Sequence, residues 1–382
     1  MSKLNDLIKE MCPNGVEYVK LEELVDYIQP AKYIVKNTNY DIKYDVPVLT
    51  AGQTFILGYT NEKDGIYYAS ADNPVIIFDD FTTSNHWVDF NFKVKSSAMK
   101  ILISKTDNLF KYIYYCISNI DYIPKEHSRQ WIQVYSQFQI PLPPLKVQEK
   151  IVKILDKFGE LEAELEAELE ARKNQYEFWR EKLLNRGNFN RQYITLGDIG
   201  KVCMCKRIMK NETSDSGDVP FYKIGTFGKQ ADAYISYDIF NDYKKRFSYP
   251  KKGEILVSCS GTIGRSVVFD GNDAYFQDSN IVWLNNDERK ILNEFLYYFY
   301  QTSPWNVSDG GTIKRLYNNQ FISAKVPLYS LEEQKRIVNI LEHFDKLIND
   351  ISEGLPAEIE LRRKQYEYYR NKLLNFEELK NE

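Results

Sequence analysis

Long apolar runs are missing from this 382-residue sequence: no stretch of 18 or more consecutive apolar residues occurs. The amino-terminal segment Met1–Glu10 is polar and charged and lacks the apolar core of a secretory signal. The sequence therefore predicts a cytoplasmic protein. Because 43% of the residues are hydrophobic and 14% are aromatic, the chain is expected to be globular rather than disordered.

Cysteine and histidine are scarce. The five cysteines are an odd, scattered number, which fits reduced thiols better than a disulfide framework. Cys203 and Cys205 form a C-x-C pair without a second pair or a nearby histidine, so no metal site is predicted. His86, His127 and His343 are isolated in the sequence and suggest no Ser-His-Asp arrangement.

Motifs of nucleotide and cofactor chemistry are also absent. Gly225–Gln230 contains a Gly-Lys pair but lacks the glycine spacing and the hydroxyl residue of a phosphate-binding loop. No G-x-G-x-x-G occurs, and Asp72–Val75 lacks the second proline and the aromatic residue of the Asn-Pro-Pro-aromatic motif of amino-methyltransferases. The sequence therefore predicts no catalytic residue and favours a binding or assembly subunit over an enzyme.

An excess of positive charge is missing too, since the formal net charge is −4. The expected helices are acidic, and only the second half of the chain contains a mildly basic module. If the protein binds DNA, local basic patches or a partner must supply the attraction to phosphate.

A repeated stretch is the most informative feature present. One copy contains Ile140–Leu145, Gln148–Leu155 and Gln175–Arg180, and the other contains Val326–Leu328, Gln334–Leu341 and Gln365–Arg370. The glutamines that begin the middle segments lie 186 positions apart, so the repeat unit is half the chain. We therefore expect two fused, similar halves, each a sheet-containing module followed by a long helix.

Apolar residues recur at intervals of three and four through about 146–184, with strong helix formers between them. The second copy carries an extra four-residue step, and Gly354 and Pro356 within it predict a kink or break. The expected fold class is α+β: two mixed α/β modules separated by two long antiparallel helices that form a coiled coil with pseudo-twofold symmetry. The alternative is that both helices are only oligomerisation or bundle elements.

The expected domains are residues 1–143, a helical region 144–187, residues 188–329 and a second helical region 330–382. Strand-like runs separated by turn residues fill both modules; in the first they are Val46–Leu49, Phe55–Leu57, Ile66–Ala69 and Val75–Phe78. In the second, Val219–Ile224 corresponds to Val46–Leu49, and Gly253–Ser258 corresponds to Pro74–Phe78. Polar loops are the candidate DNA-contacting segments, because their donors and acceptors can reach base edges and phosphates. The alternative is ordinary solvated loops and a simple hairpin turn at Ser260–Arg265.

The repeated flanks Ile140–Gln148 and Val326–Gln334, with the endings Gln175–Arg180 and Arg363–Arg370, resemble the conserved regions of the specificity subunits of type I restriction-modification enzymes. Gly261–Arg265 is also similar to a pattern of their target-recognition domains, whereas the first module departs from it. The resemblance covers essentially the whole chain. It implies two target-recognition domains that each recognise one half of a split DNA target, with helices that set the spacer.

The resemblance also implies partners and site residues. Two methyltransferase subunits would bind the helices, restriction/translocase subunits would join through them, and S-adenosylmethionine, ATP and Mg²⁺ would belong to those partners. The implied DNA-binding residues are Thr82, Thr83, Ser84, Asn85, His86, Lys125, His127, Ser128, Arg129, Gln130, Lys223, Ser260, Thr262, Arg265, Gln277, Ser279, Asn280, Thr312, Lys314 and Arg315. The implied partner-binding residues are Gln148, Tyr176, Trp179, Arg180, Gln334, Tyr366, Tyr369 and Arg370. A stand-alone DNA-binding or regulatory protein, and a coiled-coil scaffold without a nucleic-acid role, remain the competing hypotheses.

Overall fold

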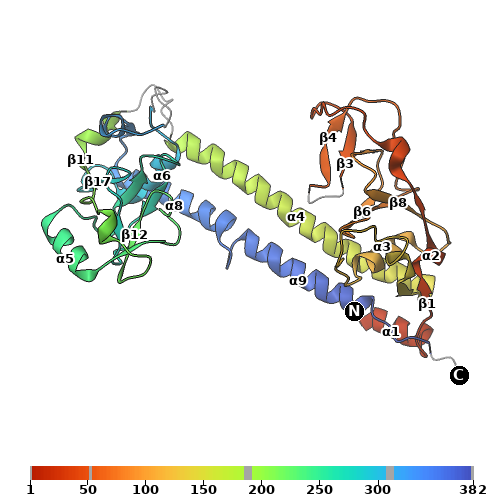
Figure 1. The fold of residues 1–382 in the computed structure, drawn as a ribbon. Helices are drawn as coiled ribbons and strands as arrows, with labels where there is room; N and C mark the ends of the chain where they lie inside the picture. The colour runs from red at the N-terminus through yellow and green to blue at the C-terminus, as the bar shows by residue number, and fades with distance from the viewer. Residues whose placement is uncertain (1, 51–53, 185–191, 307–313, 380–382) are drawn as a thin grey trace. The chain divides into compact units, whose positions relative to one another are not determined.

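The computed structural model describes residues 2–50, 54–184, 192–306 and 314–379. The chain divides into two compact units: unit 1 is residues 1–165 with 359–382, and unit 2 is residues 166–358. Each unit contains one sheet-bearing module and parts of the long helices (Figure 1). Among the described residues, no helix is both long and apolar enough to cross a membrane.

The two modules share one strand plan, which confirms the repeat predicted from the sequence. Unit 1 has a four-stranded sheet in the order β2-β8-β5-β6 and a three-stranded sheet in the order β4-β3-β7. Unit 2 has the corresponding orders β11-β17-β14-β15 and β13-β12-β16. In both three-stranded sheets the last pair is parallel, and every other pair in these sheets is antiparallel.

The strands of unit 1 are β1 (Tyr18–Lys20), β2 (Val25–Ile28), β3 (Val46–Leu49), β4 (Ile56–Thr60), β5 (Val75–Asp79), β6 (Asn85–Val88), β7 (Lys93–Val94), β8 (Met99–Ser104) and β9 (Gln139–Pro141). Those of unit 2 are β10 (Tyr193–Thr195), β11 (Gly200–Cys203), β12 (Val219–Tyr222), β13 (Tyr234–Ile235), β14 (Ile255–Ser258), β15 (Ser266–Val268), β16 (Tyr275–Phe276), β17 (Ile281–Asn286) and β18 (Lys325–Pro327). The helices are α1 (Ser2–Met11), α2 (Leu21–Leu24), α3 (Phe110–Ser118), α4 (Leu145–Leu184), α5 (Tyr237–Arg246), α6 (Asn293–Gln301), α7 (Asn318–Ile322), α8 (Leu331–Asn349) and α9 (Leu355–Leu373). Short 3-10 helices cover Pro30–Tyr33, Tyr135–Gln137, Leu196–Asp198 and Lys210–Glu212.

Most of the strand predictions are confirmed, but one is wrong. The run Ile66–Ala69 was expected to form a strand, yet it makes only a single bridge, between Tyr67 and Phe92. The ring of Tyr67 stacks on Phe92 at 5.1 Å and meets Tyr33 edge-on at 5.0 Å. The apolar residues of this run therefore serve packing in the core of the module rather than a ladder of backbone hydrogen bonds.

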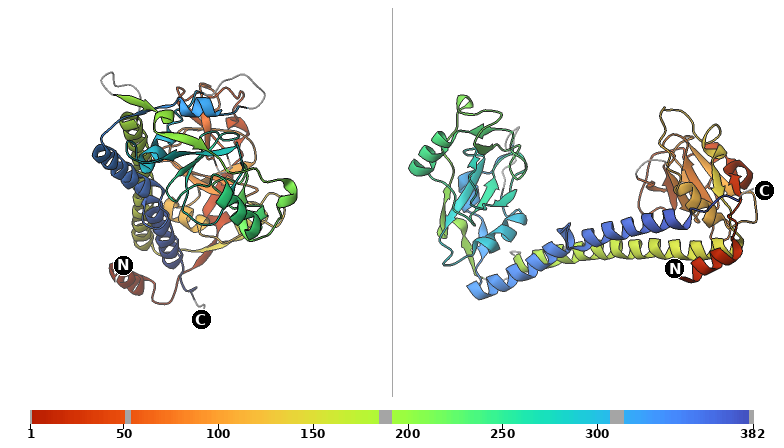
Figure 2. Two further views of the ribbon diagram at one scale, coloured as in Figure 1. Left: turned by 90° about the vertical axis from the view of Figure 1, so that its left-hand side faces the viewer. Right: turned by 90° about the horizontal axis from the view of Figure 1, so that it is seen from below.

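The long helices pair antiparallel within each unit, as predicted. In unit 1, Phe158 of α4 stacks on Tyr369 of α9 at 5.4 Å, and one turn further along α4 Glu162 accepts from Arg363 at 2.6 Å. In unit 2, Tyr176 of α4 contacts Phe344 of α8 at 6.3 Å. Both Figures 1 and 2 show these helix pairs side by side. The apolar stripe of each helix is thus covered by its partner and by the adjacent module.

The predicted interruption of the second helical region is a true break. Helix α8 ends at Asn349, α9 begins at Leu355, and the intervening residues form a turn. Ile351 in this turn is 87% exposed, so the apolar residue of the extra four-residue step is expelled from the helix packing. A Cβ on Gly354 would lie 2.6 Å from the carbonyl oxygen of Lys346, which explains why glycine stands there.

A buried glutamine ties each module to its helix by three hydrogen bonds, two of which are equivalent in the two modules. Oε1 of Gln148 accepts from the backbone N–H of Leu109, which precedes α3, and its Nε2 donates to Asn108 and to the carbonyl of Pro143. Oε1 of Gln334 accepts from the N–H of Leu292, which precedes α6, and its Nε2 donates to the carbonyls of Lys290 and Tyr329. Each glutamine belongs to one long helix, α4 or α8, and its side-chain amide caps the amino-terminal end of a second helix, α3 or α6.

Replacing Gln148 with leucine is expected to lower the free energy of unfolding by about 3 kcal/mol, because it leaves buried polar groups unpaired at about 1–3 kcal/mol each. Denaturant unfolding of the full chain measures this change. Gln334→Leu is the matched variant in unit 2, and exposed Gln133→Leu is the control. If Gln148→Leu costs no more than Gln133→Leu, the amide is not the link described above.

The two terminal segments are joined within unit 1. The N–H of Val16 donates to the carbonyl of Glu377, and the N–H of Leu379 donates back to the carbonyl of Val16. Gly15 has φ +97°, and a Cβ there would lie 2.6 Å from the Glu377 oxygen. Leu373 and Leu374 are buried in the same apolar cluster as Leu4. Residues from both parts of unit 1 therefore share one core.

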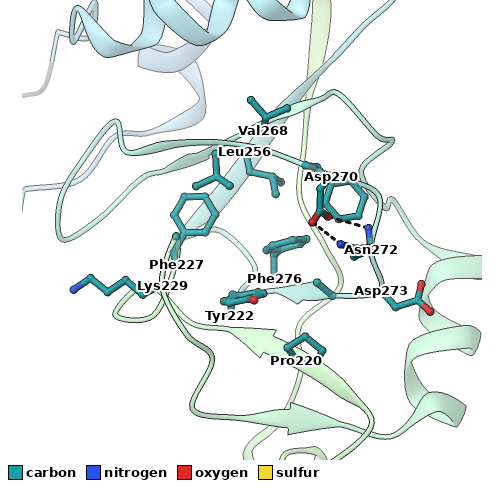
Figure 3. Close-up of a pocket in the computed structure, with 14 residues that line it drawn as sticks. Pro220, Tyr222, Phe227, Lys229, Leu256, Val268, Asp270, Asn272, Asp273 and Phe276 are labelled. Atoms are coloured by element: carbon teal, nitrogen blue, oxygen red, sulfur yellow. Dashed lines mark hydrogen bonds between the residues drawn. The ribbon is translucent and has the colours of Figure 1, made fainter. Parts of the chain in front are cut away.

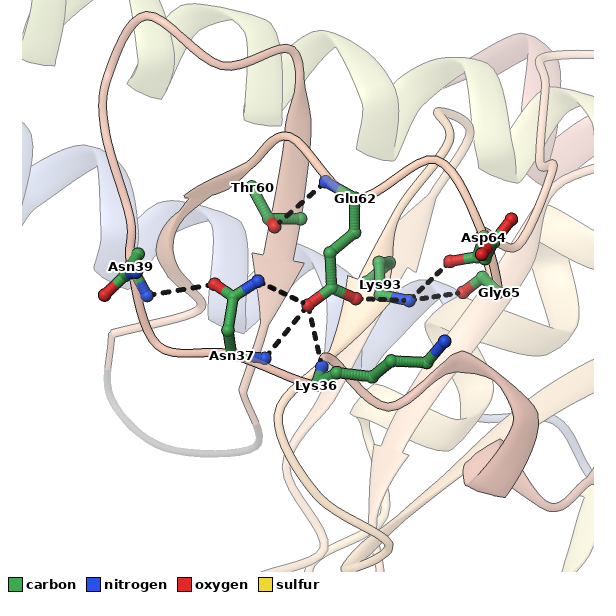
Figure 4. Close-up of polar contacts among 8 residues, drawn as sticks. All are labelled: Lys36, Asn37, Asn39, Thr60, Glu62, Asp64, Gly65 and Lys93. Atoms are coloured by element: carbon green, nitrogen blue, oxygen red, sulfur yellow. Dashed lines mark hydrogen bonds and ion pairs between the residues drawn. The ribbon is translucent and has the colours of Figure 1, made fainter.

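A buried ion pair stabilises the three-stranded sheet of unit 1 (Figure 4). Nζ of Lys93 lies 3.1 Å from Glu62 and donates to the carbonyls of Asp64 and Gly65. Burial alone would raise the pKa of the Glu62 carboxyl, but hydrogen bonds from Asn37, Lys93 and the Lys36 backbone outweigh it and lower the pKa. The carboxylate thus holds residues 36–37 against the sheet.

Candidate nucleic-acid interface

A hollow of about 480 Å³ in unit 2 gathers five of the predicted DNA-binding residues. It lies where β12 ends and where the chain passes from β16 to β17. The predicted residues that line it are Lys223, Gln277, Ser279, Asn280 and Arg315. The sequence did not single out two further cations of the lining, Arg207 and Lys210. Three aspartates, Asp215, Asp232 and Asp278, also line it against these four cations, so the formal charge of the lining is +1. Lys223 pairs with Asp232 at 2.9 Å. In a chain of net charge −4, this concave site therefore gathers a small excess of positive charge together with amide donors, which suits a nucleic-acid surface.

The side chains of the hollow are held by the backbone and side-chain groups around them. Nη2 of Arg315 donates to the carbonyl of Ser279 at 2.9 Å, and Oε1 of Gln277 accepts from the N–H of Ile224 at 2.9 Å. Nε of Arg207 donates to Asp278 at 2.9 Å. Ser279 has φ +54°, an uncommon conformation for serine that turns the chain between the two strands. These contacts fix the donors in position before any ligand arrives.

The turn Ser260–Arg265 supports this hollow rather than lining it. Oγ of Ser260 donates to Asn280 at 2.9 Å, and Thr262 is exposed. The guanidinium of Arg265 donates to the carbonyl of Phe227 at 2.8 Å and lies 3.5 Å from the hydroxyl of Thr262. The turn is therefore tied to the loop that follows β12. Lys314 is exposed beside Arg315, and Thr312 lies outside the described residues.

In unit 1 the loop 125–130 divides into exposed and buried parts. Lys125, His127, Ser128 and Arg129 are exposed, as a DNA-contacting loop requires. Gln130 is buried and is a correction to the prediction: its amide donates to Ser128 and accepts from the hydroxyl of Tyr122, so it shapes the loop from inside.

The segment 82–86 is mostly turned toward the protein. Thr83 is buried at φ +64° and donates to the carbonyl of Thr82, so it is a second correction. Asn85 accepts from Ser118, and His86 stacks on Phe55 at 4.1 Å. Burial lowers the pKa of His86, so the imidazole is neutral at pH 7 and supplies no charge to phosphate. Thr82 is exposed and Ser84 is half-buried, with their hydroxyls 3.0 Å apart.

The two basic loops occupy equivalent positions. The N–H of Gln130 donates to the carbonyl of Asp80 at 2.8 Å, and the N–H of Leu316 donates to the carbonyl of Cys259 at 2.8 Å. The acceptor is the residue that follows β5 in the first module and β14 in the second. Each of these strands lies next to an edge strand, β6 or β15, of its four-stranded sheet. Arg129 and Arg315 immediately precede the two donors, so they are matching residues of the two modules.

The predicted partner-binding residues lie mainly on the inner face of the helices. Gln148 and Gln334 are 0% exposed and Tyr176 is buried, so these three predictions are wrong: their side chains are used inside the protein. Tyr366 and Tyr369 are half-buried against Phe158. The guanidinium of Arg180 lies 5.2 Å from the ring of Tyr176, and that of Arg370 lies 5.3 Å from Tyr366. Trp179 is half-buried under Lys182.

Two other aromatic residues of the same repeated motif face outward. Phe178 of α4 is 57% exposed and Tyr368 of α9 is 60% exposed, and each has a lysine beside its ring, Lys182 or Lys372. We call these the outward aromatic pairs. The sequence carried a signal for them, because Phe178 and Tyr368 fall at the same place in Gln175–Arg180 and Gln365–Arg370, about half a helical turn from the buried tyrosines.

A smaller hollow of about 230 Å³ in unit 2 has an aromatic lining (Figure 3). Tyr222 stacks on Phe276 at 5.8 Å within it, and Asp270 and Asp273 lie on its wall. None of the predicted site residues lines it. Its lining has two carboxylates and one cation, Lys229, so its formal charge is −1, whereas that of the larger hollow is +1; phosphate is therefore disfavoured here. The described residues contain no His, Cys, Asp and Glu cluster that could hold a metal ion.

The family model of the type I restriction modification DNA specificity domain matches residues 13–171 and 190–361. The chain therefore belongs to the family of type I restriction-modification specificity proteins. It is 45% identical over 380 residues to a putative type I restriction enzyme specificity subunit of Haemophilus influenzae, with 94% of this chain and 96% of that protein covered. It is 40% identical over 402 residues to the EcoR124I/EcoR124II specificity subunit of Escherichia coli, with 98% of each chain covered.

Solved structures show the same fold at low identity. The S subunit of a type I system from M. genitalium matches with a TM-score of 0.53 and 14% identity, covering 94% of this chain and 96% of that one. A chain from work on complex assembly and conformational transition of the type I system matches with a TM-score of 0.55 and 14% identity, covering 95% and 98%. The α+β class with two sheet-bearing modules and long helices is thereby confirmed.

Proposed function

We propose that this chain is the DNA-reading subunit of a type I restriction-modification complex and that each module reads one half of a bipartite target. The hollow of unit 2 carries this proposal, because arginine and glutamine are the side chains that pair bidentately with guanine and adenine. The matching loop of unit 1 offers Arg129 and three exposed neighbours for the other half. Family membership supports the same function.

Catalysis and its cofactors are assigned to partner subunits. Two methyltransferase subunits would bind the helices, carry S-adenosylmethionine and methylate an adenine flipped from the duplex. Restriction/translocase subunits, joined through them, would use ATP and Mg²⁺. Since the net charge of this chain is −4, the partners would also supply much of the attraction to the DNA backbone.

A mobility-shift titration with and without the cognate methyltransferase tests this function. The probe is a duplex that carries the motif found by methylome sequencing of cells expressing the whole complex. The proposal expects weak binding by the chain alone and tight, sequence-dependent binding after the methyltransferase is added. Equal binding without it would favour a stand-alone DNA-binding protein, and no sequence dependence in either case would favour a scaffold.

The outward aromatic pairs are expected to be contact points for the methyltransferase subunits. Phe178→Ala and Tyr368→Ala should each weaken that association by about 10- to 30-fold, because central aromatic residues dominate interface energies. Analytical ultracentrifugation or surface plasmon resonance with the purified methyltransferase measures the change. Ile351→Ala, an exposed apolar residue of the α8–α9 turn, is the matched control and should have no effect. Wild-type association by the Phe178→Ala, Tyr368→Ala double variant would place the interface elsewhere.

A further inference from the structure

The residue after β5 in the first module corresponds to the residue after β14 in the second. Asp80 donates its N–H to the carbonyl of Ala98 and accepts from Gln130, while Cys259 donates to Asn280 and accepts from Leu316. The same two backbone hydrogen bonds therefore define positions 80 and 259.

The opposing strand supplies a second matched position. Met99 of β8 lies opposite Asp79, and Ile281 of β17 lies opposite Ser258. The residues that follow, Lys100 and Val282, are consequently equivalent, and both are completely buried. The first module thus carries an aspartate and a lysine at the two interior positions where the second carries a cysteine and a valine.

The charged pair is buried directly beneath Arg129. Nζ of Lys100 lies 3.4 Å from Oδ2 of Asp80, and both side chains are at most 1% exposed. Arg129 approaches the same oxygen at 3.9 Å from the outside, with 51% of its side chain exposed. The other oxygen of Asp80 accepts from the N–H of Trp131 at 2.9 Å. The lysine ammonium also faces the ring of Tyr27 at 4.8 Å.

The three equivalent positions carry the same net charge in the two modules. Asp80, Lys100 and Arg129 sum to one positive charge, and so do Cys259, Val282 and Arg315. Burial raises the pKa of the Cys259 thiol to about 11, although nearby Arg315 lowers it, so this thiol is uncharged at pH 7. Stability alone does not require the buried ion pair, since the same fold uses apolar residues at these positions and such replacements are often neutral.

We propose that Lys100 is a positioning residue: it neutralises Asp80 from the buried side and so leaves the guanidinium of Arg129 available to the DNA half-target of the first module. Without Lys100, the buried carboxylate would have Arg129 as its only cation among the contacts described above, and a buried carboxylate attracts a neighbouring cation far more strongly than water-exposed charges attract each other. This inference rests on the proposed DNA-reading function.

The test uses the whole complex and a duplex of about 30 base pairs that carries the methylated motif, with affinity measured at several salt concentrations. Lys100→Met is expected to weaken binding about tenfold and to reduce the slope of log affinity against log salt by about one, as Arg129→Ala does. The Lys100→Met, Arg129→Ala double variant should bind no worse than either single variant. Asp80→Asn with Lys100→Met restores the single positive charge and keeps an acceptor for Trp131, so it should bind within about twofold of wild type.

Four results separate the hypotheses. Wild-type binding by Lys100→Met, additive losses in the Arg129 double variant, or failure of Asp80→Asn to rescue would each overturn the role of Lys100. The rescue variant remains decisive even where Lys100→Met alone does not fold, and thermal melting reports folding in each case. If Arg129→Ala and Arg315→Ala are both silent, the proposed DNA-reading function itself fails, whereas a silent Lys100→Met beside a weakened Arg129→Ala refutes only this inference.

Discussion

A chain with Leu-Glu-Ala-Glu inserted after Glu168 is expected to recognise the same two half-sequences across a longer spacer. The insertion continues the existing repeat of Leu161–Arg172 within α4, so the helix should remain intact. Four residues add about 6 Å of helix, which is close to two base-pair rises of 3.4 Å. Methylation at the original spacing should fall by at least about 100-fold, because both modules can no longer engage one such site together.

Methylome sequencing of cells expressing the altered complex measures both the half-sequences and the spacer. Glu170→Ala, an exposed change on the same helix that leaves its length unaltered, is the control and should keep the original motif. Retention of the original spacer by the insertion variant would show that α4 does not set the separation of the half-targets. Altered half-sequences would show that the insertion disturbs the modules themselves.

Arg315→Ala is expected to weaken binding to the half-target of the second module by about 10- to 100-fold, since a well-placed arginine contact to DNA contributes about 1–3 kcal/mol. Arg315 lines the hollow, and its guanidinium is oriented by the carbonyl of Ser279. If it contacts a base, one position of the second half-sequence should become degenerate. If it contacts phosphate, affinity should fall uniformly and the salt slope should decrease by about one.

Arg265→Ala is the matched control for this prediction. Its guanidinium donates to Phe227 and Thr262 inside the module, so its loss is expected to lower thermal stability more than DNA affinity. Filter binding and thermal melting of both variants distinguish the two roles. Unchanged affinity and specificity in Arg315→Ala, with a loss in Arg265→Ala, would reverse the assignment of these arginines.

The helices and their repeat could be predicted because local periodicity determines them. The apolar stripe from Val147 to Leu183 predicts α4 without any tertiary information. The glycine and proline near the extra four-residue step predict the break between α8 and α9 in the same way. The strands β3, β5, β12 and β14 were likewise visible as apolar runs between turn residues. Ile66–Ala69 failed as a strand because its neighbours in space, rather than its own sequence, decide how its apolar residues are used.

The site was harder to predict, because burial of a polar residue depends on contacts far along the chain. Gln148 forms a hydrogen bond with Leu109, and Gln130 forms hydrogen bonds with Tyr122 and Asp80. No local sequence pattern predicts these hydrogen bonds. On the helices, periodicity located the repeated motif but not its exposed face: Tyr176 points inward, while Phe178, two residues on, is exposed. The helical phase of the buried Val147, Ile151 and Leu155 predicts the inward face at Tyr176 only if the helix keeps ideal geometry over the 21 positions from Leu155 to Tyr176.

The joining of the two terminal segments affects how the protein can fold during its synthesis. Unit 2 is one continuous stretch, residues 166–358, whereas unit 1 needs residues 359–382 to cover the apolar side chains of its first 165 residues. During translation, residues 1–165 are therefore expected to keep apolar surface exposed until residues 359–382 have been synthesised. Unit 2 can complete its fold before unit 1, although residues 1–165 leave the ribosome first. Premature release before Leu373 and Leu374 are added should consequently yield a nascent product prone to aggregation and to capture by chaperones.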